Sequence, residues 1–329
     1  LNISSSLKSH FLIMDAISYV FSVPLRLISL IISLPLVLFG KLYDLVFKKK
    51  PEEPHTILIT GASSGICKEI AIQYAKPGST LILVARNMER LNAVAEIVRE
   101  KGAEVTVASI DVQDAQKIRN FIHKQDDLHP IDLLIAGAGA VTPSDNASYS
   151  FSDLYDYVLK ANVTTCYNTV LPIVDRMRER RRGQICIFSS VAGLGMNFIS
   201  PLYSSAKIAV QGFGEALQTI LPRYGVHVSL VCPGYTQTPI LDTNTGKDMN
   251  WILDPKDVAA MVIDGLQCDY AVIECNMAYN LGVASFVQYI PKLARDYLFQ
   301  MIIPIAKRYG MFLNEYPSFE AIYEKEKQD

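Results

Sequence analysis

From residue 56 onward, short apolar runs alternate with longer amphipathic stretches, and this alternation constrains the fold more than any other feature. Seven strands are expected, at residues 56–60, 80–85, 104–108, 131–136, 184–189, 226–232 and 271–275. Their nearly continuous Val, Ile and Leu content is typical of parallel strands covered on both faces. Between them lie helical patterns such as residues 90–100, with apolar side chains at i, i+3, i+4 and i+7. The sequence therefore predicts an α/β fold with a doubly wound, mostly parallel seven-stranded sheet and helices on both faces.

The composition narrows the classes of function. Of the 329 residues, 50% are hydrophobic and 19% are charged, which disfavours intrinsic disorder. The formal net charge of −2 provides no basic face, so no nucleic-acid partner is expected. The cysteines form no C-x-x-C pair and the histidines show no ligand spacing. We therefore expect reduced thiols and no metal.

The N-terminal part of the chain has a different character. Over residues 16–40 the only charged residue is Arg26, and this stretch exceeds the roughly 20 residues that cross a hydrocarbon core. We expect an N-terminal hydrophobic anchor helix that either spans the membrane or lies in its interface. Lys8 precedes the stretch, whereas Lys41 and residues 48–50, all lysine, follow it. The positive-inside rule then places the rest of the chain in the cytosol.

The first expected strand runs directly into the turn Thr-Gly-Ala-Ser-Ser-Gly-Ile at residues 60–66. Gly61 at the end of a strand and Gly65 at the start of a helix suit phosphate binding, because glycine admits the phosphate and the helix N-terminus offers free N–H groups. This arrangement is typical of a Rossmann-like dinucleotide site. At the tip of the second strand stands Arg86, with no acid beside it. A base there pairs with a 2′-phosphate, so NADP(H) is favoured over NAD(H).

A candidate catalytic set lies further along the chain. Tyr203 and Lys207 are four residues apart in a helical pattern and so share one helix face. The reference pKa of tyrosine, about 10, is high for acid–base work at neutral pH, and a neighbouring lysine cation is expected to lower it. Ser190 ends the fifth expected strand, at the edge where open α/β sheets bind ligands. Asn162 lies in the helical stretch that follows the fourth strand.

Taken in order, these motifs make the chain similar to the short-chain dehydrogenase/reductase family. The matching segments are T-G-A-S-S-G-I at 60–66, D-V at 111–112, A-G-A-G at 136–139, Asn162, S-S-V-A-G at 189–193, Y-S-S-A-K at 203–207 and P-G-Y-T-Q-T at 233–238. The resemblance implies hydride transfer between a nicotinamide cofactor and a carbonyl carbon. It makes Tyr203 the general acid/base and Lys207 the residue that lowers its pKa and contacts the nicotinamide ribose. It also implies that Ser190 polarises the carbonyl and that Asn162 holds a water in a proton relay.

The resemblance also implies which residues contact the cofactor. These are Gly61, Ser63, Ser64, Gly65, Ile66, Arg86, Asp111, Val112, Ala138, Tyr203, Lys207, Pro233, Gly234 and Thr238. Two positions depart from the family pattern: its third turn glycine is Cys67 here, and an asparagine that ties neighbouring strands is Gly137. Both departures bear on the seating of the cofactor rather than on proton transfer. They leave open the alternative that the chain is a membrane-tethered binding protein that has this fold but catalyses no reaction.

Two segments beyond the family motifs bear on the substrate, and the second of them is rich in apolar residues. Residues 239–253 form the expected substrate loop, and residues 277–306 form either an amphipathic membrane-surface segment or a dimer-packing helix. We therefore divide the chain into an anchor at 1–50, a catalytic domain at 51–276 and an extension at 277–329. An apolar access route beside a membrane, such as the endoplasmic reticulum, suits a lipid or long-chain ketone, with a sphingoid ketone as one candidate.

The leading hypothesis is an NADPH-dependent, membrane-anchored ketoreductase that assembles as a homodimer or tetramer. An NAD(P)+-dependent alcohol or steroid dehydrogenase is the alternative within enzymes.

Overall fold

The computed structural model describes residues 28, 31–40, 42, 51–141, 150–194, 201–240, 252–275 and 301. Its contacts divide the chain into two units. The smaller unit comprises Leu1–Lys50 and Pro291–Arg295, and the larger comprises Pro51–Ile290 and Asp296–Asp329. The sheet and all the candidate catalytic residues belong to the larger unit.

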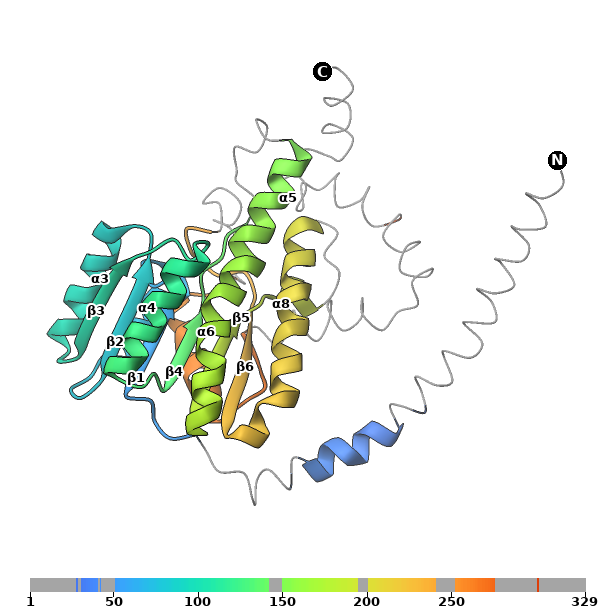
Figure 1. The fold of residues 1–329 in the computed structure, drawn as a ribbon. Coiled ribbons are helices and arrows are strands. Elements are labelled where there is room, and N and C mark those ends of the chain that lie inside the picture. The colour runs from blue at the N-terminus through green and yellow to red at the C-terminus, as the bar shows by residue number, and fades with distance from the viewer. Residues whose placement is uncertain are drawn as a thin grey trace. The chain divides into compact units, whose positions relative to one another are not determined.

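Strands and helices alternate through the larger unit (Figure 1). The strands are β1 Thr56–Thr60, β2 Thr80–Ala85, β3 Glu104–Ser109, β4 Leu133–Ala136, β5 Gly183–Phe188, β6 Val226–Pro233 and β7 Val272–Cys275. The α-helices are α2 Gly65–Tyr74, α3 Met88–Glu100, α4 Ala115–Leu128, α5 Phe151–Leu159, α6 Thr165–Arg180, α7 Val191–Leu194, α8 Pro201–Ile220 and α9 Pro255–Gln267. A π-helical turn, η2 Lys160–Thr164, joins α5 to α6, and a 3-10 turn, η3 Pro222–Tyr224, precedes β6.

The sheet has the strand order β3-β2-β1-β4-β5-β6-β7, and every pairing in it is parallel. This confirms the doubly wound Rossmann-like fold; the strands expected from the sequence differ from the observed ones by at most a residue or two at their ends. The order changes direction between β1 and β4. In open α/β sheets, ligands bind at the carboxyl ends of the strands beside such a switch point.

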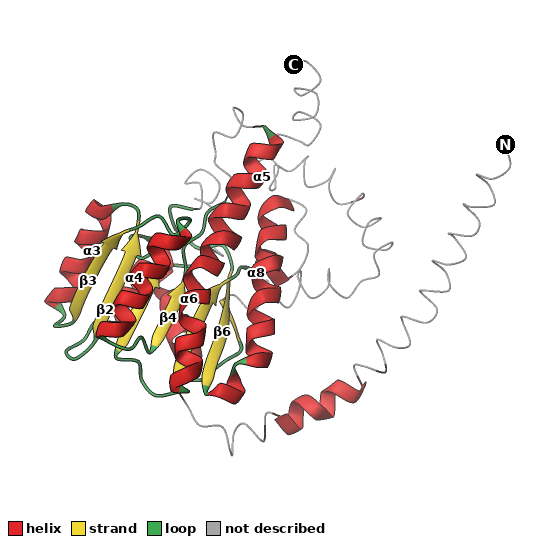
Figure 2. Cartoon of the chain, viewed as in Figure 1, coloured by secondary structure: helices red, strands yellow, loops and turns green. Residues whose placement is uncertain are grey.

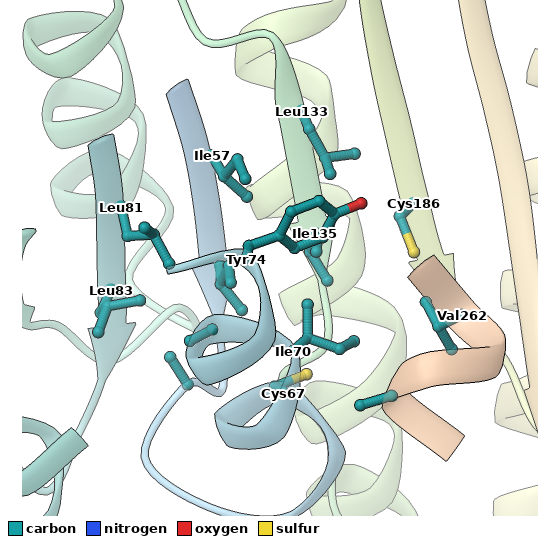
Figure 3. Close-up of a cluster of buried hydrophobic side chains, with 14 of the residues drawn as sticks. Ile57, Cys67, Ile70, Tyr74, Leu81, Leu83, Leu133, Ile135, Cys186 and Val262 are labelled. Atoms are coloured by element: carbon teal, nitrogen blue, oxygen red, sulfur yellow. The ribbon is translucent and has the colours of Figure 1, made fainter. Parts of the chain in front are cut away.

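Helices cover both faces of the sheet (Figure 2). Because successive side chains of a strand point to opposite faces, Ile57 and Ile59 of β1 face one layer and Leu58 faces the other. The first layer is built from α2, α3 and α9, and Figure 3 shows part of it around Ile70 and Val262. The second is built from α4, α6 and α8. Two packed layers fix the sheet, and with it the edge that carries the site.

The smaller unit contains a helical stretch at residues 31–40. Its large apolar side chains are exposed in every direction around the helix, from 53% for Val37 to 72% for Ile31. Among the residues that the structure describes, no helix is long and apolar enough to cross a membrane. The anchor expected over 16–40 is described only in part, because residues 16–27 lie outside the described residues. The same holds for residues 241–251 of the expected substrate loop and for almost all of the expected extension.

Candidate active site

The four expected catalytic residues come together at the carboxyl edge of the sheet. Ser190 lies two residues beyond β5, and Tyr203 and Lys207 occupy the first turns of α8. Asn162 belongs to the turn η2, between α5 and α6. A Cβ atom added at Gly139, just beyond β4, would lie 2.9 Å from Asn162 Oδ1 and 3.6 Å from Lys207 Nζ. The loop after β4 therefore passes close to both the amide and the ammonium.

The ammonium of Lys207 is hydrogen-bonded to the end of strand β5. Lys207 is only 5% exposed, and its Nζ donates a 2.9 Å hydrogen bond to the carbonyl oxygen of Phe188. The same Nζ lies 5.6 Å from the centroid of the Tyr203 ring. Burial lowers the pKa of Lys207 to about 8. The side chain is therefore a cation at pH 7, but one that loses its proton in mildly alkaline solution.

The state of Tyr203 differs from the sequence-based expectation. Burial raises the pKa of Tyr203 to about 12, and a hydrogen bond with the Ser190 side chain only partly opposes this. The expected lowering by Lys207 is not seen, because removal from water disfavours the phenolate. Tyr203 therefore carries its proton throughout the neutral range. That is the state required of a proton donor to a ketone oxygen.

Asn162 presents an unused acceptor to the site. Its amide Nδ2 donates to the carbonyls of Ala140, at 2.7 Å, and Val158, at 2.9 Å. Its Oδ1 is buried and has no hydrogen-bond partner among the described residues. Buried acceptors normally have partners, in many cases ordered water. An acceptor fixed in this way beside Lys207 suits the water-holding role expected of Asn162.

The turn at residues 60–66 has the backbone features of an anion-binding site. Gly61 and Gly65 have φ values of +75° and +59°, a region that disfavours residues with a Cβ atom. No side chain caps α2 at Ser64, and its first turn carries no acid. By contrast, α3, α4, α5 and α9 all begin with a side-chain cap. The N–H groups at the start of α2 are thus left for a phosphate, which fits a dinucleotide.

The remaining expected cofactor residues lie in or beside this turn, or at and just beyond the carboxyl ends of strands. Thr238 packs against the turn at Gly65, because a Cβ atom added at Gly65 would lie 3.0 Å from Thr238 Cγ2. Arg86 is exposed just beyond β2, and its carbonyl accepts from Ser109 Oγ at 2.9 Å. Val112 is buried, and its carbonyl accepts from Asn168 Nδ2 at 2.9 Å. The other members are Ser63, Ser64, Ile66, Asp111, Ala138, Pro233 and Gly234, which lie beside the turn or at strand ends.

Comparison with known proteins identifies the family. The sequence profile described as short chain dehydrogenase matches residues 55–248. The chain belongs to this family. It is therefore an oxidoreductase that acts on carbonyl and CH–OH groups with a nicotinamide cofactor.

Several relatives and solved structures resemble this dehydrogenase. A 3-ketodihydrosphingosine reductase of Mus musculus is 32% identical over 65% of this chain and 69% of its own length. An uncharacterised oxidoreductase of Staphylococcus saprophyticus is 30% identical over 64% of this chain and 90% of its own. A short-chain dehydrogenase from Sphingobium yanoikuyae, solved with NADPH, has a TM-score of 0.61 and 24% identity over 72% of this chain and 96% of its own. The structural likeness agrees with the doubly wound fold.

In this dehydrogenase the strands next to Gly137 are tied together without an asparagine side chain. Thr60 Oγ1, which is fully buried, donates to the Ile135 carbonyl at 3.3 Å. It also accepts from the backbone N–H groups of Gly137, at 3.2 Å, and Ala138, at 3.4 Å. One hydroxyl thus joins the end of β1 to the end of β4. The sequence places Thr60 in the phosphate turn but does not reveal this second role.

A surface cavity beside the phosphate turn was also not anticipated. It has a volume of about 430 Å³ and lies between α2, α3 and the segment around Pro239 and Pro255. Lys68 and Arg90 line it together with Ser63 and Ser64. The cavity adjoins the first turn of α2 and does not include the four candidate catalytic residues. The sequence does not reveal that Lys68 and Arg90 line one cavity, because they lie on different helices, α2 and α3, whose packing depends on the fold.

Proposed function

We propose that this dehydrogenase is an NADPH-dependent reductase of long-chain ketones. The observation that carries the proposal is the arrangement of Tyr203, which is hydrogen-bonded to Ser190 and has the buried Lys207 ammonium 5.6 Å from the centroid of its ring. A phenol that keeps its proton at neutral pH supports the donation of that proton to a carbonyl oxygen. The reverse reaction, alcohol oxidation, requires the same phenol to be deprotonated.

The catalytic roles follow from these positions. When bound, the nicotinamide supplies the hydride that the carbonyl carbon receives. Ser190 donates a hydrogen bond to the carbonyl oxygen and polarises it, and Tyr203 then transfers its proton to that oxygen. Lys207, whose ammonium lies 5.6 Å from the centroid of the Tyr203 ring, would contact the nicotinamide ribose. Asn162 Oδ1 holds the water through which the proton of Tyr203 is replaced.

The choice of cofactor rests on Arg86. Its exposed guanidinium stands at the carboxyl end of β2, where the adenosine ribose of a dinucleotide lies in this fold. A guanidinium forms paired hydrogen bonds with a phosphate, whereas an acid would select a free 2′-hydroxyl. This supports NADPH over NADH. It also supports the direction of reduction, because the cellular NADP pool is held mostly reduced.

The substrate class is inferred from the relatives. Proteins named 3-ketodihydrosphingosine reductase, from Mus musculus and Bos taurus, and 3-dehydrosphinganine reductase, from Arabidopsis thaliana, are 28–33% identical to this chain. Others are named ketoacyl reductases. These names share a ketone on an acyl or sphingoid chain. We therefore propose 3-ketodihydrosphingosine as the leading candidate within that class.

We further propose that the chain meets its substrate at a lipid surface. In support, apolar side chains are exposed all around residues 31–40, and residues 48–50 are all lysine. A helix that is apolar on every side is stable in lipid rather than in water. The proposal places the enzyme on the cytosolic face of the endoplasmic reticulum membrane. Flotation with vesicles tests the proposal by comparing the full chain with residues 51–329. If both float with the vesicles to the same extent, the proposal is contradicted.

The experiment that tests the activity is a panel of ketones of increasing chain length, assayed with NADPH and with NADH. We expect turnover with NADPH that rises with chain length and is lost in Tyr203→Phe. No oxidation of NADPH with any ketone would overturn the proposal. If NADPH nevertheless raised the melting temperature, the binding-protein alternative would be favoured. Faster alcohol oxidation than ketone reduction at pH 7 would favour the reverse reaction.

A further inference from the structure

The two positions that depart from the family pattern are in contact with each other. A Cβ atom added at Gly137 would overlap Cys67 Sγ, and would lie 3.1 Å from the carbonyl oxygen of Thr60. Gly137 does not have a positive φ, so its backbone conformation does not itself require glycine. The space for a side chain at position 137 is instead occupied by the thiol. Cys67 and Gly137 are therefore complementary: one carries the volume that the other lacks.

The thiol acts here through its volume rather than its reactivity. Cys67 is 5% exposed and belongs to the apolar layer that includes Ile70, Ile135 and Cys186 (Figure 3). Burial raises the pKa of Cys67 to about 12, so the thiol is neutral. A neutral buried thiol packs as a small apolar group.

Gly137 links both ends of the phosphate-binding turn. Its N–H donates to Thr60 Oγ1, and its carbonyl oxygen lies 3.0 Å from where a Cβ atom of Gly61 would stand. Its other side faces Cys67, in the first turn of α2. The segment after β4 is thus packed between the start of the turn and the helix that follows it. A change in volume at either position must move the turn or this segment.

We propose that Cys67 and Gly137 form a positioning pair that sets how the turn at residues 60–66 receives the phosphates of the dinucleotide. The pair touches no reacting atom, and it acts through Gly61 and the first turn of α2. The inference rests on the cofactor site of the proposed function, and not on the ketone or on the choice between NADPH and NADH.

The test is a double-mutant cycle in the full chain. Gly137→Ala adds the carbon that would overlap the thiol, Cys67→Gly removes the thiol, and the double variant combines both changes. We expect about a tenfold or greater loss of NADPH affinity in Gly137→Ala, a smaller loss in Cys67→Gly, and recovery to within about threefold of wild type in the double variant. Affinity is measured by titration without ketone, and kcat at saturating NADPH should stay within about twofold throughout.

Two further variants make the result specific. Gly212→Ala adds the same carbon on α8, where it meets no atom within 4 Å, and should leave affinity unchanged. Cys67→Ser keeps most of the volume and should bind nearly as well as wild type. If Gly137→Ala fails to fold, folding of the double variant is the equivalent test.

Some outcomes would overturn the pairing. These are losses that simply add in the double variant, a double variant that does not fold, or unchanged affinity in Gly137→Ala. If the wild type binds neither NADPH nor NADH, both this inference and the proposed function fail. If it binds them without reducing ketones, only the proposed function fails.

Discussion

The ammonium of Lys207 donates a 2.9 Å hydrogen bond to the carbonyl of Phe188, the last residue of β5. This bond holds the cation at the strand end that also leads to Ser190. It does so in a place with little water, since Lys207 is nearly fully buried and its pKa is lowered to about 8 from an ordinary value of 10.5. The catalytic cation is therefore unfavourable for stability at neutral pH.

Replacing Lys207 by Met should stabilise the protein while abolishing reduction. At pH 7 we expect the free energy of unfolding to rise by about 1–3 kcal/mol, the cost of the buried charge less the lost hydrogen bond. Between pH 8 and 10.5 the unfolded chain holds a proton that the folded chain has lost, so wild-type stability gains on the variant as pH rises. Thermal unfolding at pH 7 and pH 10 checks both statements. A variant less stable than wild type at pH 7 would contradict them.

The two directions of the reaction should respond oppositely to alkali. Tyr203 keeps its proton because burial raises its pKa to about 12, so alcohol oxidation should accelerate as pH rises toward that value. Ketone reduction should slow above about pH 8, where Lys207 loses its charge. Profiles of kcat against pH in both directions measure this. Tyr203→Phe should lose about 10²–10⁴ in kcat and still bind NADPH; a reduction rate that climbs from pH 7 to 10 would refute the assignment.

Reversing the charge at Arg86 should change the preferred cofactor. Arg86→Asp removes the partner of a 2′-phosphate and supplies an acceptor for a 2′-hydroxyl. We expect kcat/KM to fall about 10- to 100-fold with NADPH and to rise with NADH. Arg119→Asp, a charge reversal at another exposed arginine, on α4, is the matched control. The same loss in both variants would mean that the net charge alone is responsible.

The hydroxyl of Thr60 should matter more for stability than its size suggests. Thr60→Val leaves the N–H groups of Gly137 and Ala138 without their acceptor, which should lower the free energy of unfolding by about 2–4 kcal/mol. Thr60→Ser retains the hydroxyl and should lose about 1 kcal/mol, the value of one buried methyl group. Ser229→Ala is the control, because Ser229 Oγ is buried with no partner among the described residues. Denaturant unfolding compares the three; equal losses in Thr60→Val and Thr60→Ser would argue against the tie.

The sequence predicts the sheet well because strands such as β1 and β2 are encoded by local apolar runs, and their ends agree with the observed ones. It also predicts Ser190 at the carboxyl end of a strand and Tyr203 and Lys207 on one helix face, and the resemblance to the family assigns all three to one site. It does not predict that the pKa of Tyr203 is raised, because the burial that raises it depends on the folded surroundings.

Contacts between distant positions are harder still to predict. Cys67 and Gly137 look like two separate defects in the sequence, and only the fold brings them together. The N-terminal anchor is a different case: hydropathy alone predicts it, and the described residues contain no helix that could span a membrane.

Because of the π-helical turn η2, the direction in which Asn162 points depends on the number of residues in this segment as well as on their identity. A π-turn contains one residue more than the α-helical turn it replaces, and one residue corresponds to about 100° around a helix. The side chains of α6 that pack on the sheet, such as Val170 and Ile173, are set in phase with Asn162 by that extra residue. A homologue with a single residue deleted between Val158 and Thr165 would still show an asparagine in the matching alignment column. It would nevertheless have lost that side chain from its catalytic centre.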